Sequence, residues 1–535
     1  MKKYTIGIDF GTLSGRAVLV DVVTGEKAAV SVLDYPHGVM EKCLPCGRPL
    51  GTDWALQHPE DYLDVLRSTI PGVLKQAGVF CEQVIGLGID FTSSTVMPVK
   101  ADGTPLCFLE EFKGRPHAYV KLWKHHAAQN YADKLNMTAK SRQEPWLWRY
   151  GGKVSSEWLF PKLWQILDED EEIYNATTHF IEAADWLIWK LTGKLSRSAC
   201  MAGYKALWHK VSGYPSEDFF AALESGLKTV VADKLNGHII SIGAKAGEVS
   251  AFGAKLTGLN MGAAVAAANV DAHVSIPAVK ITGPGKMLAI MGTSTCHMLL
   301  ASEEKAVQGI CGVMYEGILP GLYGYEAGQC CVGDHFGWFI ENFAAGLTHQ
   351  DMSEKAAKLK AGESGLLALD WWNGNRSVLV DADLSGVILG MSLTTKPEEV
   401  YRALVEATAF GTRTIIRAYE DESLAVDEFY AAGGISLNPV VMQIYADIIK
   451  KPVKIVGDAH TSAVGSAIFG AVAAGCHDVK TAIEIMGQSG GRVFIPNKVE
   501  CAVYDKLYDE YSALHDYFGR GGSNVLKRLK NIKKL

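Results

Sequence analysis

The chain has 535 residues, of which 48% are hydrophobic and 21% are charged, and its formal net charge is −7. This length exceeds what one hydrophobic core supports, so we expect at least two large domains, with a cleft between them in which ligands can bind. The acidic balance leaves no broad basic face, which excludes nucleic acid and an anionic membrane surface as main partners.

Targeting and redox features indicate a cytoplasmic protein. The first 20 residues lack the basic-then-apolar pattern of a signal peptide, and no run approaches the about 20 apolar residues that a membrane span requires. Eleven cysteines at irregular spacing are typical of free thiols in a reducing compartment. Cys43 and Cys46 form a lone CxxC without a second ligand pair, so we expect no zinc site there.

The N-terminal part predicts an α/β arrangement. Strands over 4–9, 15–23 and 27–35 form an expected antiparallel meander. Apolar residues at helical spacing predict a helix over 59–76, and a short apolar run predicts a strand over 84–89. The order of strands, helix and strand is typical of α/β proteins.

The turn after the first strand has the outline of a phosphate-and-metal site. It brings together a carboxylate (Asp9), a glycine (Gly11), two hydroxyls (Thr12 and Ser14) and a guanidinium (Arg16). Glycine lets backbone N–H groups approach phosphate oxygens, the side chains add donors, and a carboxylate can hold Mg²⁺ through water. The alternative is a tight hairpin whose hydroxyls only cap the turn.

A second α/β set is expected after Gly262, with strands over 263–268 and 286–290. We therefore predict an N-terminal domain over 1–262 and a C-terminal domain over 263–535, which ends in a helical tail.

The second set repeats the strand-to-turn pattern of the first. Gly292 and Thr293 follow the strand over 286–290 as Gly11 and Thr12 follow the first strand. We interpret the two turns as related phosphate sites that face each other across a cleft.

Asp271 is predicted at the end of the Ala-rich strand, where sites in α/β proteins are built. In phosphoryl transfer to an alcohol, one carboxylate accepts the hydroxyl proton and aims the oxygen. We interpret Asp271 as this base, with an N-cap for the next helix as the alternative. His273 is interpreted as a core or surface histidine.

Glycines and an asparagine follow a predicted strand at 427–430. Gly433 and Gly434 expose a flat backbone surface on which an adenine or ribose can lie, and Asn438 supplies a directional amide. The alternative is a plain strand-to-helix turn with an asparagine cap. Because neither GxGxxG nor the Walker pattern occurs, a Rossmann cofactor site and a P-loop are not expected.

These segments, in this order, resemble the FGGY carbohydrate kinases, which are relatives of the actin, Hsp70 and hexokinase fold. The resemblance spans nearly the whole chain. Its motifs are 7–12, 57–62, 155–164, Asp271, 292–294 and 433–453. It implies a two-domain α/β protein with an interdomain cleft.

Within the family, the chain is most similar to members that act on L-ribulose, through 325–329, 369–376 and 401–411. The implied reaction is ATP-dependent phosphorylation of L-ribulose to L-ribulose 5-phosphate, in L-arabinose catabolism. The alternatives are another pentulose or polyol kinase, for xylulose or ribitol, and a non-enzymatic ATP switch like actin or Hsp70. The oligomeric state stays open, with a homodimer as one alternative.

The resemblance also implies roles for single residues. Asp271 is implied as the base, and Asp9 and Asp271 as partners of Mg²⁺ through water. The residues implied to bind ATP are Thr12, Ser14, Arg16, Gly292, Thr293, Gly433, Gly434 and Asn438.

The implied sugar site departs from that of glycerol kinases. Those enzymes hold substrate hydroxyls with an Arg-Glu pair, where this chain has Ser93 and Ser94. Small side chains leave room for a five-carbon ketose, so other residues must supply the contacts. The candidates are Trp123 as an apolar wall and Lys205 and Glu326 as hydroxyl partners, beside Ser93 and Asp271.

Overall fold

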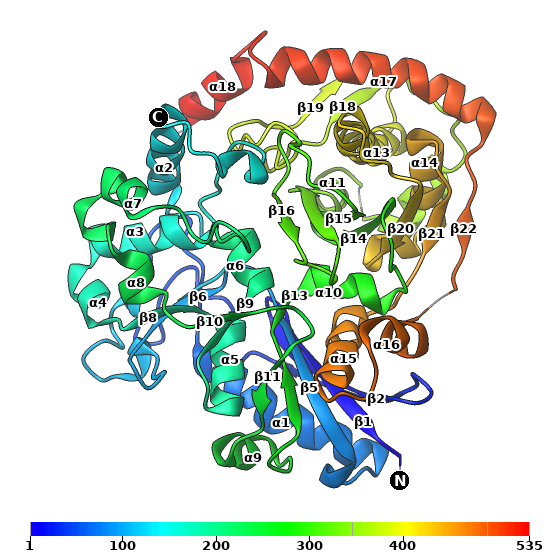
Figure 1. Ribbon diagram of the computed structural model, residues 1–535. Helices are drawn as coiled ribbons and strands as arrows, with labels where there is room; N and C mark the ends of the chain where they lie inside the picture. The colour runs from blue at the N-terminus through cyan, green and yellow to red at the C-terminus, as the bar shows by residue number, and fades with distance from the viewer. Residues whose placement is uncertain (1, 345, 489, 534–535) are drawn as a thin grey trace.

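The computed structural model describes residues 2–344, 346–488 and 490–533. Two seven-stranded sheets form the centre of the described chain, and a lobe of helices with a smaller sheet lies beside the first of them (Figure 1).

The first sheet has the strand order β11-β12-β5-β1-β2-β3, with β13 also beside β5. β1 pairs antiparallel with β2 and parallel with β5, so the chain forms a hairpin and then returns through a helix. The strands are β1 (Tyr4–Phe10), β2 (Ser14–Asp21), β3 (Lys27–Asp34), β5 (Val84–Phe91), β11 (Lys245–Glu248), β12 (Ala264–Ala266) and β13 (Asn269–Val270).

The second sheet repeats this plan. Its order is β16-β17-β15-β14-β20-β21-β22, and β14 pairs antiparallel with β15 and parallel with β20. The strands are β14 (Lys286–Met291), β15 (Thr295–Ala301), β16 (Gly312–Tyr315), β17 (Tyr323–Gln329), β20 (Glu428–Ala432), β21 (Val453–Ile455) and β22 (Val493–Phe494).

Most of the lobe is inserted between β5 and β11 of the first sheet along the chain, and a separate buried apolar cluster fills it. Its four-stranded sheet consists of β4 (Leu56–Gln57), β7 (Val120–Lys121), β6 (Val96–Val99) and β8 (His179–Glu182). Two short sheets pair β9 (Ser196–Ser198) with β10 (His238–Ile240) and β18 (Leu367–Leu369) with β19 (Val387–Leu389).

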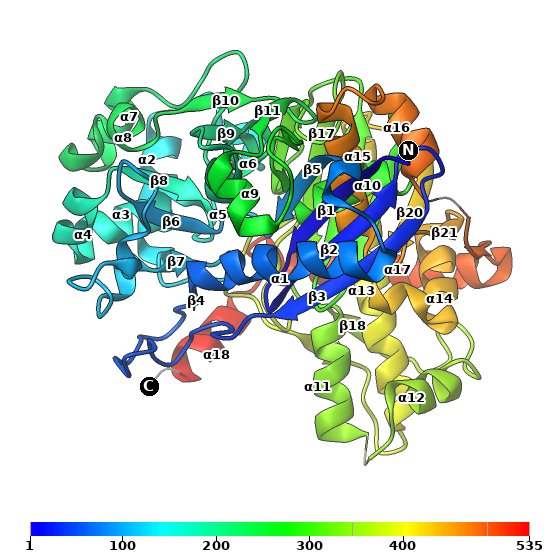
Figure 2. The same ribbon diagram turned by 90° about the horizontal axis from the view of Figure 1, so that it is seen from below.

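Helices cover the sheets and fill the lobe, as a second view shows (Figure 2). In the first half they are α1 (Pro59–Ala77), α2 (Gln129–Ser141), α3 (Leu159–Glu169), α4 (Glu171–Ala176), α5 (Ala183–Thr192), α6 (Ala199–Lys205), α7 (Glu217–Leu223), α8 (Val230–Lys234), α9 (Ala251–Thr257) and α10 (Asp271–Ala278). In the second half they are α11 (Gly333–Phe343), α12 (His349–Ala356), α13 (Pro397–Asp421), α14 (Pro439–Ile449), α15 (Thr461–Ala473), α16 (Val479–Met486), α17 (Lys498–Gly519) and α18 (Val525–Lys533).

Most elements expected from the sequence are confirmed, and one strand is placed differently. The meander of β1, β2 and β3, helix α1 and strand β5 form where they were predicted. The strand expected over 263–268 forms as β12, but it pairs with β5 in the first sheet, so its assignment to the second set is wrong. Periodicity shows that a buried strand exists, whereas its partner depends on tertiary packing. The second sheet starts at β14, so the chain passes between the sheets within 270–286.

Helix α15 comes from the C-terminal half but packs on β1 and β5 of the first sheet. Glycines make this contact close: a Cβ on Gly7 would lie 1.6 Å from the Ala463 carbonyl oxygen, and one on Gly88 would lie 2.0 Å from that of Ser466. α15 also packs against α10, so these two helices join the two halves of the molecule.

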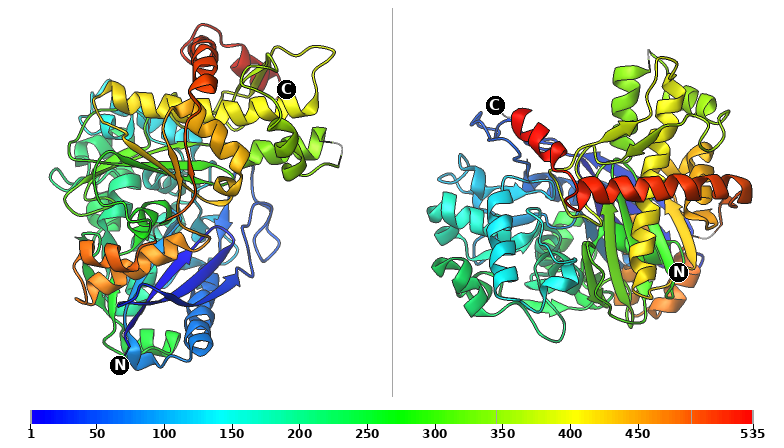
Figure 3. Two further views of the ribbon diagram at one scale, coloured as in Figure 1. Left: turned by 90° about the vertical axis from the view of Figure 1, so that its right-hand side faces the viewer. Right: turned by 90° about the horizontal axis from the view of Figure 1, so that it is seen from above.

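The C-terminal helices cross the top of the molecule in Figure 1, and Figure 3 shows α17 lying along it. The basic α18 is held by ion pairs from Lys527 to Asp381, at 2.5 Å, and from Lys530 to Asp383, at 3.2 Å. Within the described ranges, no helix is both long and apolar enough to span a bilayer.

Candidate functional site

The turn after β1 is a tight hairpin that gathers polar groups on one side. Asp9 and Arg16 lie directly opposite each other, and the Arg16 Nε lies 3.6 Å from Asp9 Oδ2. The Arg16 Nη2 donates to Ser14 Oγ at 3.2 Å, and the Gly11 N–H donates to the Ser14 carbonyl at 3.0 Å. The local fold is therefore the expected hairpin, and its geometry also brings the carboxylate, the hydroxyl and the guanidinium together.

Residues distant in sequence hold this turn in place. Gln57 Nε2 donates to the Thr12 carbonyl at 2.8 Å, and the Tyr35 hydroxyl donates to the Gly11 carbonyl at 3.0 Å. The Trp123 indole N–H donates to Thr12 Oγ1 at 3.2 Å. Trp123 thus contacts the turn that we expected to bind phosphate, besides offering an apolar face.

Carboxylates meet at the ends of three neighbouring strands. The parallel register places Asp9 opposite Asp90, and Asn269 of β13 also lies opposite Asp90. Asp271 follows β13 as the first residue of α10, whose N-cap is Val270. The Asp271 carboxylate accepts the Ala272 N–H at 2.6 Å. Asp271 therefore lies in the first helical turn, one residue past the N-cap.

Sequence reasoning missed Asp90, although the chain carries a signal for it. The tetrapeptide Gly-Ile-Asp-Phe occurs at 7–10 and again at 88–91, and the structure pairs the two copies residue by residue. Phe10 and Phe91 stack with ring centroids 5.1 Å apart. Asp90 is fully buried and accepts the Ser466 hydroxyl at 2.6 Å, while its Oδ1 has no partner among the described residues.

The proximity of these carboxylates shifts their pKa values upward. Burial and then the nearby Asp9 raise the pKa of Asp271 to about 7. The same two causes raise the pKa of Asp90 well above its usual range, and burial raises that of Asp9 against the opposing effect of Arg16. Mutual repulsion is the condition that a divalent cation relieves, and carboxylate oxygens are ligands that Mg²⁺ prefers. The donor set thus fits the expected ion.

The turn after β14 has the same backbone hydrogen bond but carries no charged side chain. The Gly292 N–H donates to the Ser294 carbonyl at 2.9 Å, and Met291 lies opposite Thr295. The start of α11 packs against it: the Gly333 N–H donates to the Gly292 carbonyl at 3.0 Å and the Val332 N–H to the Thr293 carbonyl at 2.8 Å.

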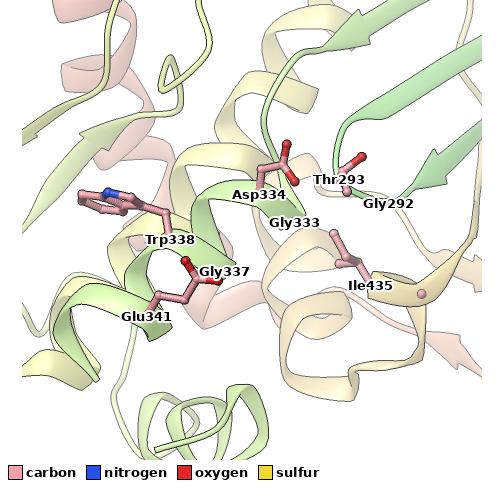
Figure 4. A pocket seen from close by; sticks show the side chains of 9 residues that line it. Gly292, Thr293, Gly333, Asp334, Gly337, Trp338, Glu341 and Ile435 are labelled. Atoms are coloured by element: carbon pink, nitrogen blue, oxygen red, sulfur yellow. The ribbon is translucent and has the colours of Figure 1, made fainter. Parts of the chain in front are cut away.

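A pocket of about 470 Å³ opens beside this second turn (Figure 4). Three of the residues expected to bind ATP lie in its wall, together with one face of α11. The lining residues are Gly292, Thr293, Gly333, Asp334, Gly337, Trp338, Glu341, Gly434 and Ile435. The α11 residues were missed, although Gly333 and Gly337 at i and i+4 clear one helix face.

Gly433 and Asn438 flank the pocket residues Gly434 and Ile435 along the chain without lining the pocket. Gly433 has φ of 94°, and a Cβ there would lie 2.5 Å from the Met291 carbonyl oxygen, so only glycine fits. Asn438 is the N-cap of α14: its Oδ1 accepts the Val440 N–H at 3.0 Å, and its Nδ2 donates to Ser353 Oγ at 2.7 Å. The capping alternative is therefore realised, and both polar groups of this side chain have protein partners.

Lys205 and Glu326 form a buried ion pair between α6 and β17. The Lys205 Nζ lies 2.8 Å from Glu326 Oε1, and the His273 Nε2 lies 3.1 Å from Glu326 Oε2. Burial raises the pKa of Glu326, but Lys205 and His273 outweigh this effect and lower it overall. His273 stands two residues after Asp271 on α10, which brings this charged cluster next to the carboxylates. The alternative of a solvated Lys205 is wrong, because its exposed fraction is 5%.

Ser93 lies half-buried in the loop after β5, and among the described residues its hydroxyl has no hydrogen-bond partner. Its neighbour Ser94 donates to the Glu157 carbonyl at 2.6 Å. The Lys162 Nζ donates to the Ser94 carbonyl at 2.6 Å and to that of Leu122 at 2.9 Å, so the loop is fixed to the lobe.

Comparison with known proteins places this geometry in a family. The model of the N-terminal domain of the FGGY family of carbohydrate kinases matches residues 4–276, and that of the C-terminal domain matches residues 287–474. The chain is 54% identical over 541 residues to a ribulokinase of Bacillus licheniformis, with 98% of each chain covered. It is 50% identical over 551 residues to a ribulokinase of Halalkalibacterium halodurans, covering 100% of this chain and 98% of the relative.

Solved structures show the same fold at lower identity. A xylulose kinase from Rhodospirillum rubrum superposes with a TM-score of 0.79 at 23% identity, covering 96% of this chain and 98% of the other. A gluconate kinase from Lactobacillus acidophilus superposes with a TM-score of 0.82 at 18% identity, covering 97% and 99%. The two-domain actin- and hexokinase-like fold that the resemblance implied is confirmed.

Proposed function

The chain belongs to the FGGY family of carbohydrate kinases, and we propose that it transfers the γ-phosphoryl group of ATP to L-ribulose, which yields L-ribulose 5-phosphate and ADP. The full-length similarity to ribulokinases at 50% to 54% identity supports this substrate. The observation that carries the proposal is the position of Asp271 at a strand end, beside both Asp9 and the Lys205–Glu326 pair. Such a reaction serves L-arabinose catabolism.

In this proposal Asp271 accepts the proton of the reacting hydroxyl and aims its oxygen at the phosphorus. Lys205 donates to sugar hydroxyls and Glu326 accepts from them, with Ser93 and Trp123 at the border of the sugar site. Their support is the buried ion pair, whose two partners contact each other directly at 2.8 Å and so hold each other in place.

The phosphates are bound between the two hairpin turns. Thr12, Ser14 and Arg16 donate from the first turn, where Arg16 already lies beside Asp9. Thr293 offers its backbone N–H and hydroxyl from the second turn, while Gly292, whose own N–H closes the turn, lets a phosphate approach the backbone closely. Closure of the cleft excludes water, which otherwise consumes ATP by hydrolysis.

The nucleoside lies in the pocket beside α11, with Gly434 in its wall and Gly433 and Asn438 at the adjoining edge. The pocket volume of about 470 Å³ and the Trp338 side chain in its wall support this placement. Because Asn438 already caps α14, we propose that it acts by holding the backbone of this edge.

Mg²⁺, when bound, neutralises phosphate charge. We propose that Asp9 and Asp271 hold it through water, since their repulsion is relieved by a cation. The eleven free thiols support a reducing, cytoplasmic location for the enzyme.

A coupled assay of ADP release with and without L-ribulose tests the proposal. We expect ADP formation to require the sugar, and L-ribulose to rank above xylulose and ribitol by kcat/KM. A better rate with xylulose or ribitol would move the substrate within the family. Equal ADP release without sugar would instead favour an ATP switch.

A further inference from the structure

Arg376 is a half-buried arginine that belongs to none of the proposed phosphate, nucleoside or sugar contacts. It ends the 369–376 segment, and its side chain is 21% exposed. The Ser377 hydroxyl accepts the Gly328 N–H at 3.2 Å, which ties this loop to β17. A Cβ on Gly328 would lie 3.0 Å from Arg376 Cδ, so the arginine stem lies directly over this glycine.

This position brings Arg376 to the same side of β17 as the sugar cluster. Gly328 follows Glu326 by two residues, and residues two apart on a strand face the same side of the sheet. Glu326 binds Lys205 and His273 there. The Arg376 guanidinium therefore lies on the same side of the sheet as the polar side chains that run from Asp271 to the Lys205–Glu326 pair.

Across the domain interface, the Arg376 Nη2 meets Glu157 Oε1 at 3.4 Å. His126 Nε2 reaches the same oxygen at 3.1 Å. The Glu157 segment also borders the sugar cluster, because the neighbouring Trp158 ring lies 5.5 Å from the Lys205 Nζ. The Glu157 carbonyl accepts a hydrogen bond from the hydroxyl of Ser94, the neighbour of Ser93.

Glu157 alone leaves most donors of Arg376 unused. A guanidinium carries five N–H donors, and within the described residues the contact to Glu157 is its one hydrogen bond to an oxygen, while the Cys330 thiol beside it is only a weak sulfur acceptor. Three thiols lie near it, and burial raises the pKa of two of them, Cys296 and Cys311, to about 12, so they add no negative charge. Donors without acceptors, still partly accessible beside a substrate site, call for a ligand with oxygen acceptors.

We propose that Arg376 is a further substrate-binding residue, which donates to sugar oxygens at the end away from the hydroxyl that faces Asp271, and that Glu157 positions its guanidinium. This inference rests on the proposed function, since it assigns a second end to the same sugar site. A hydroxyl or ketose carbonyl at that end supplies the acceptors that the protein lacks.

The simpler alternative is that the Arg376–Glu157 ion pair is a brace, which only stabilises the contact between the two domains. The chain offers a matched control for this alternative. Arg149 pairs with Glu304 at 3.1 Å between the lobe and the C-terminal half, with side chains 17% and 20% exposed. It resembles the Arg376–Glu157 pair in type and exposure, but it takes no part in the proposed site. A brace predicts the same consequences for both pairs.

The test compares Arg376→Met, Arg376→Lys and Arg149→Met with the wild-type chain. For each we would measure KM for L-ribulose, KM for ATP, kcat, thermal stability, and sugar binding by calorimetry without nucleotide. Loss of hydrogen bonds from a charged donor weakens binding roughly tenfold to a hundredfold. We expect Arg376→Met to raise the sugar KM and Kd by this factor with an ATP KM within about twofold of wild type, and Arg376→Lys to restore part of the loss.

Glu157→Gln adds a separate readout for positioning. It keeps Arg376 but weakens its anchor, so we expect a smaller rise in the sugar KM, of about threefold to tenfold. A sugar Kd for both Arg376 variants within about twofold of wild type would overturn the inference, as would an equal rise in Arg149→Met. If Arg376→Met does not fold, Arg376→Lys decides the test.

Wild-type turnover separates this inference from the proposed function. If the wild-type enzyme phosphorylates a different pentose, the substrate assignment fails, and the same variants are compared on that sugar. If it phosphorylates L-ribulose and the Arg376 variants bind the sugar normally, only the inference fails.

Discussion

The β1–β2 hairpin and the β14–β15 hairpin occupy equivalent places in the two sheets, yet they differ in side chains. Each lies beside a parallel strand that returns through a helix, and in each a glycine N–H closes the turn. The first carries Asp9, Ser14 and Arg16, whereas the second offers Gly292 and Thr293 beside an open pocket.

This difference assigns phosphoryl transfer to the first turn and nucleotide binding to the second. The charged turn can act on phosphates whose charge changes during transfer, because its donors and carboxylates are fixed by neighbouring strands. The turn after β14, which has no charged side chain, lets a ligand approach the backbone closely and leaves room for the nucleoside. If the comparison is right, substitutions in the first turn change the rate, and those at the second change nucleotide affinity.

The largest expected effect comes from Asp271, which lies between the two turns along the chain. Asp271→Asn removes the base but keeps the shape of the side chain, so we expect kcat to fall by about 10²- to 10⁴-fold while ATP affinity changes little. Steady-state kinetics and calorimetric ATP binding measure the two quantities. Asp218→Asn, at an exposed position in the first turn of α7, is the control. Near-normal turnover of Asp271→Asn would remove the assigned role.

Arg16 tests the first turn directly. Arg16→Met deletes the guanidinium beside Asp9, and we expect kcat to fall by roughly 10²-fold because charge in the transition state loses a fixed donor. The KM for sugar should change by less than about threefold. A pure defect in sugar binding would contradict the phosphate role, and titration of the variant with L-ribulose would reveal it.

Gly433 tests the edge of the second turn. Gly433→Ala adds a Cβ 2.5 Å from the Met291 carbonyl oxygen at φ of 94°, so the strand end must shift. We expect a rise of about tenfold in the ATP KM and a smaller change in kcat. Gly283→Ala, before β14 and outside the pocket, is the control, because a Cβ there meets nothing within 4 Å. Equal effects of the two variants would argue against strain as the cause.

The smallest effect is expected at Trp123. Trp123→Phe keeps an aromatic face but removes the N–H that bonds Thr12 Oγ1 at 3.2 Å. The loss of one neutral hydrogen bond should lower kcat/KM by about twofold to tenfold. If the fall appears in the sugar KM alone, Trp123 serves the sugar site and not the phosphate turn.

How far the sequence predicts the site depends on whether the residues that contact each other are close together in the chain. The strand-turn units around Asp9 and Gly292 are recognisable from composition and spacing, because backbone geometry and residue chemistry are set within a few residues. The repeated Gly-Ile-Asp-Phe tetrapeptide points to Asp90 as well, once the two strands are known to pair. By contrast, no local signal places Arg376 against Glu157 or α11 against the second turn.

By itself, the sequence determined the α/β class, the two equivalent hairpins, the family resemblance and most of the candidate residues. The tertiary structure decided which strands share a sheet, as β12 shows, and which side chains are already occupied, as the cap at Asn438 shows. It also brought α15 from the C-terminal half onto the glycines of the first sheet and buried the Lys205–Glu326 pair. The physical reason is that periodicity and turn chemistry act over a few residues, whereas packing and ion pairing join groups hundreds of residues apart.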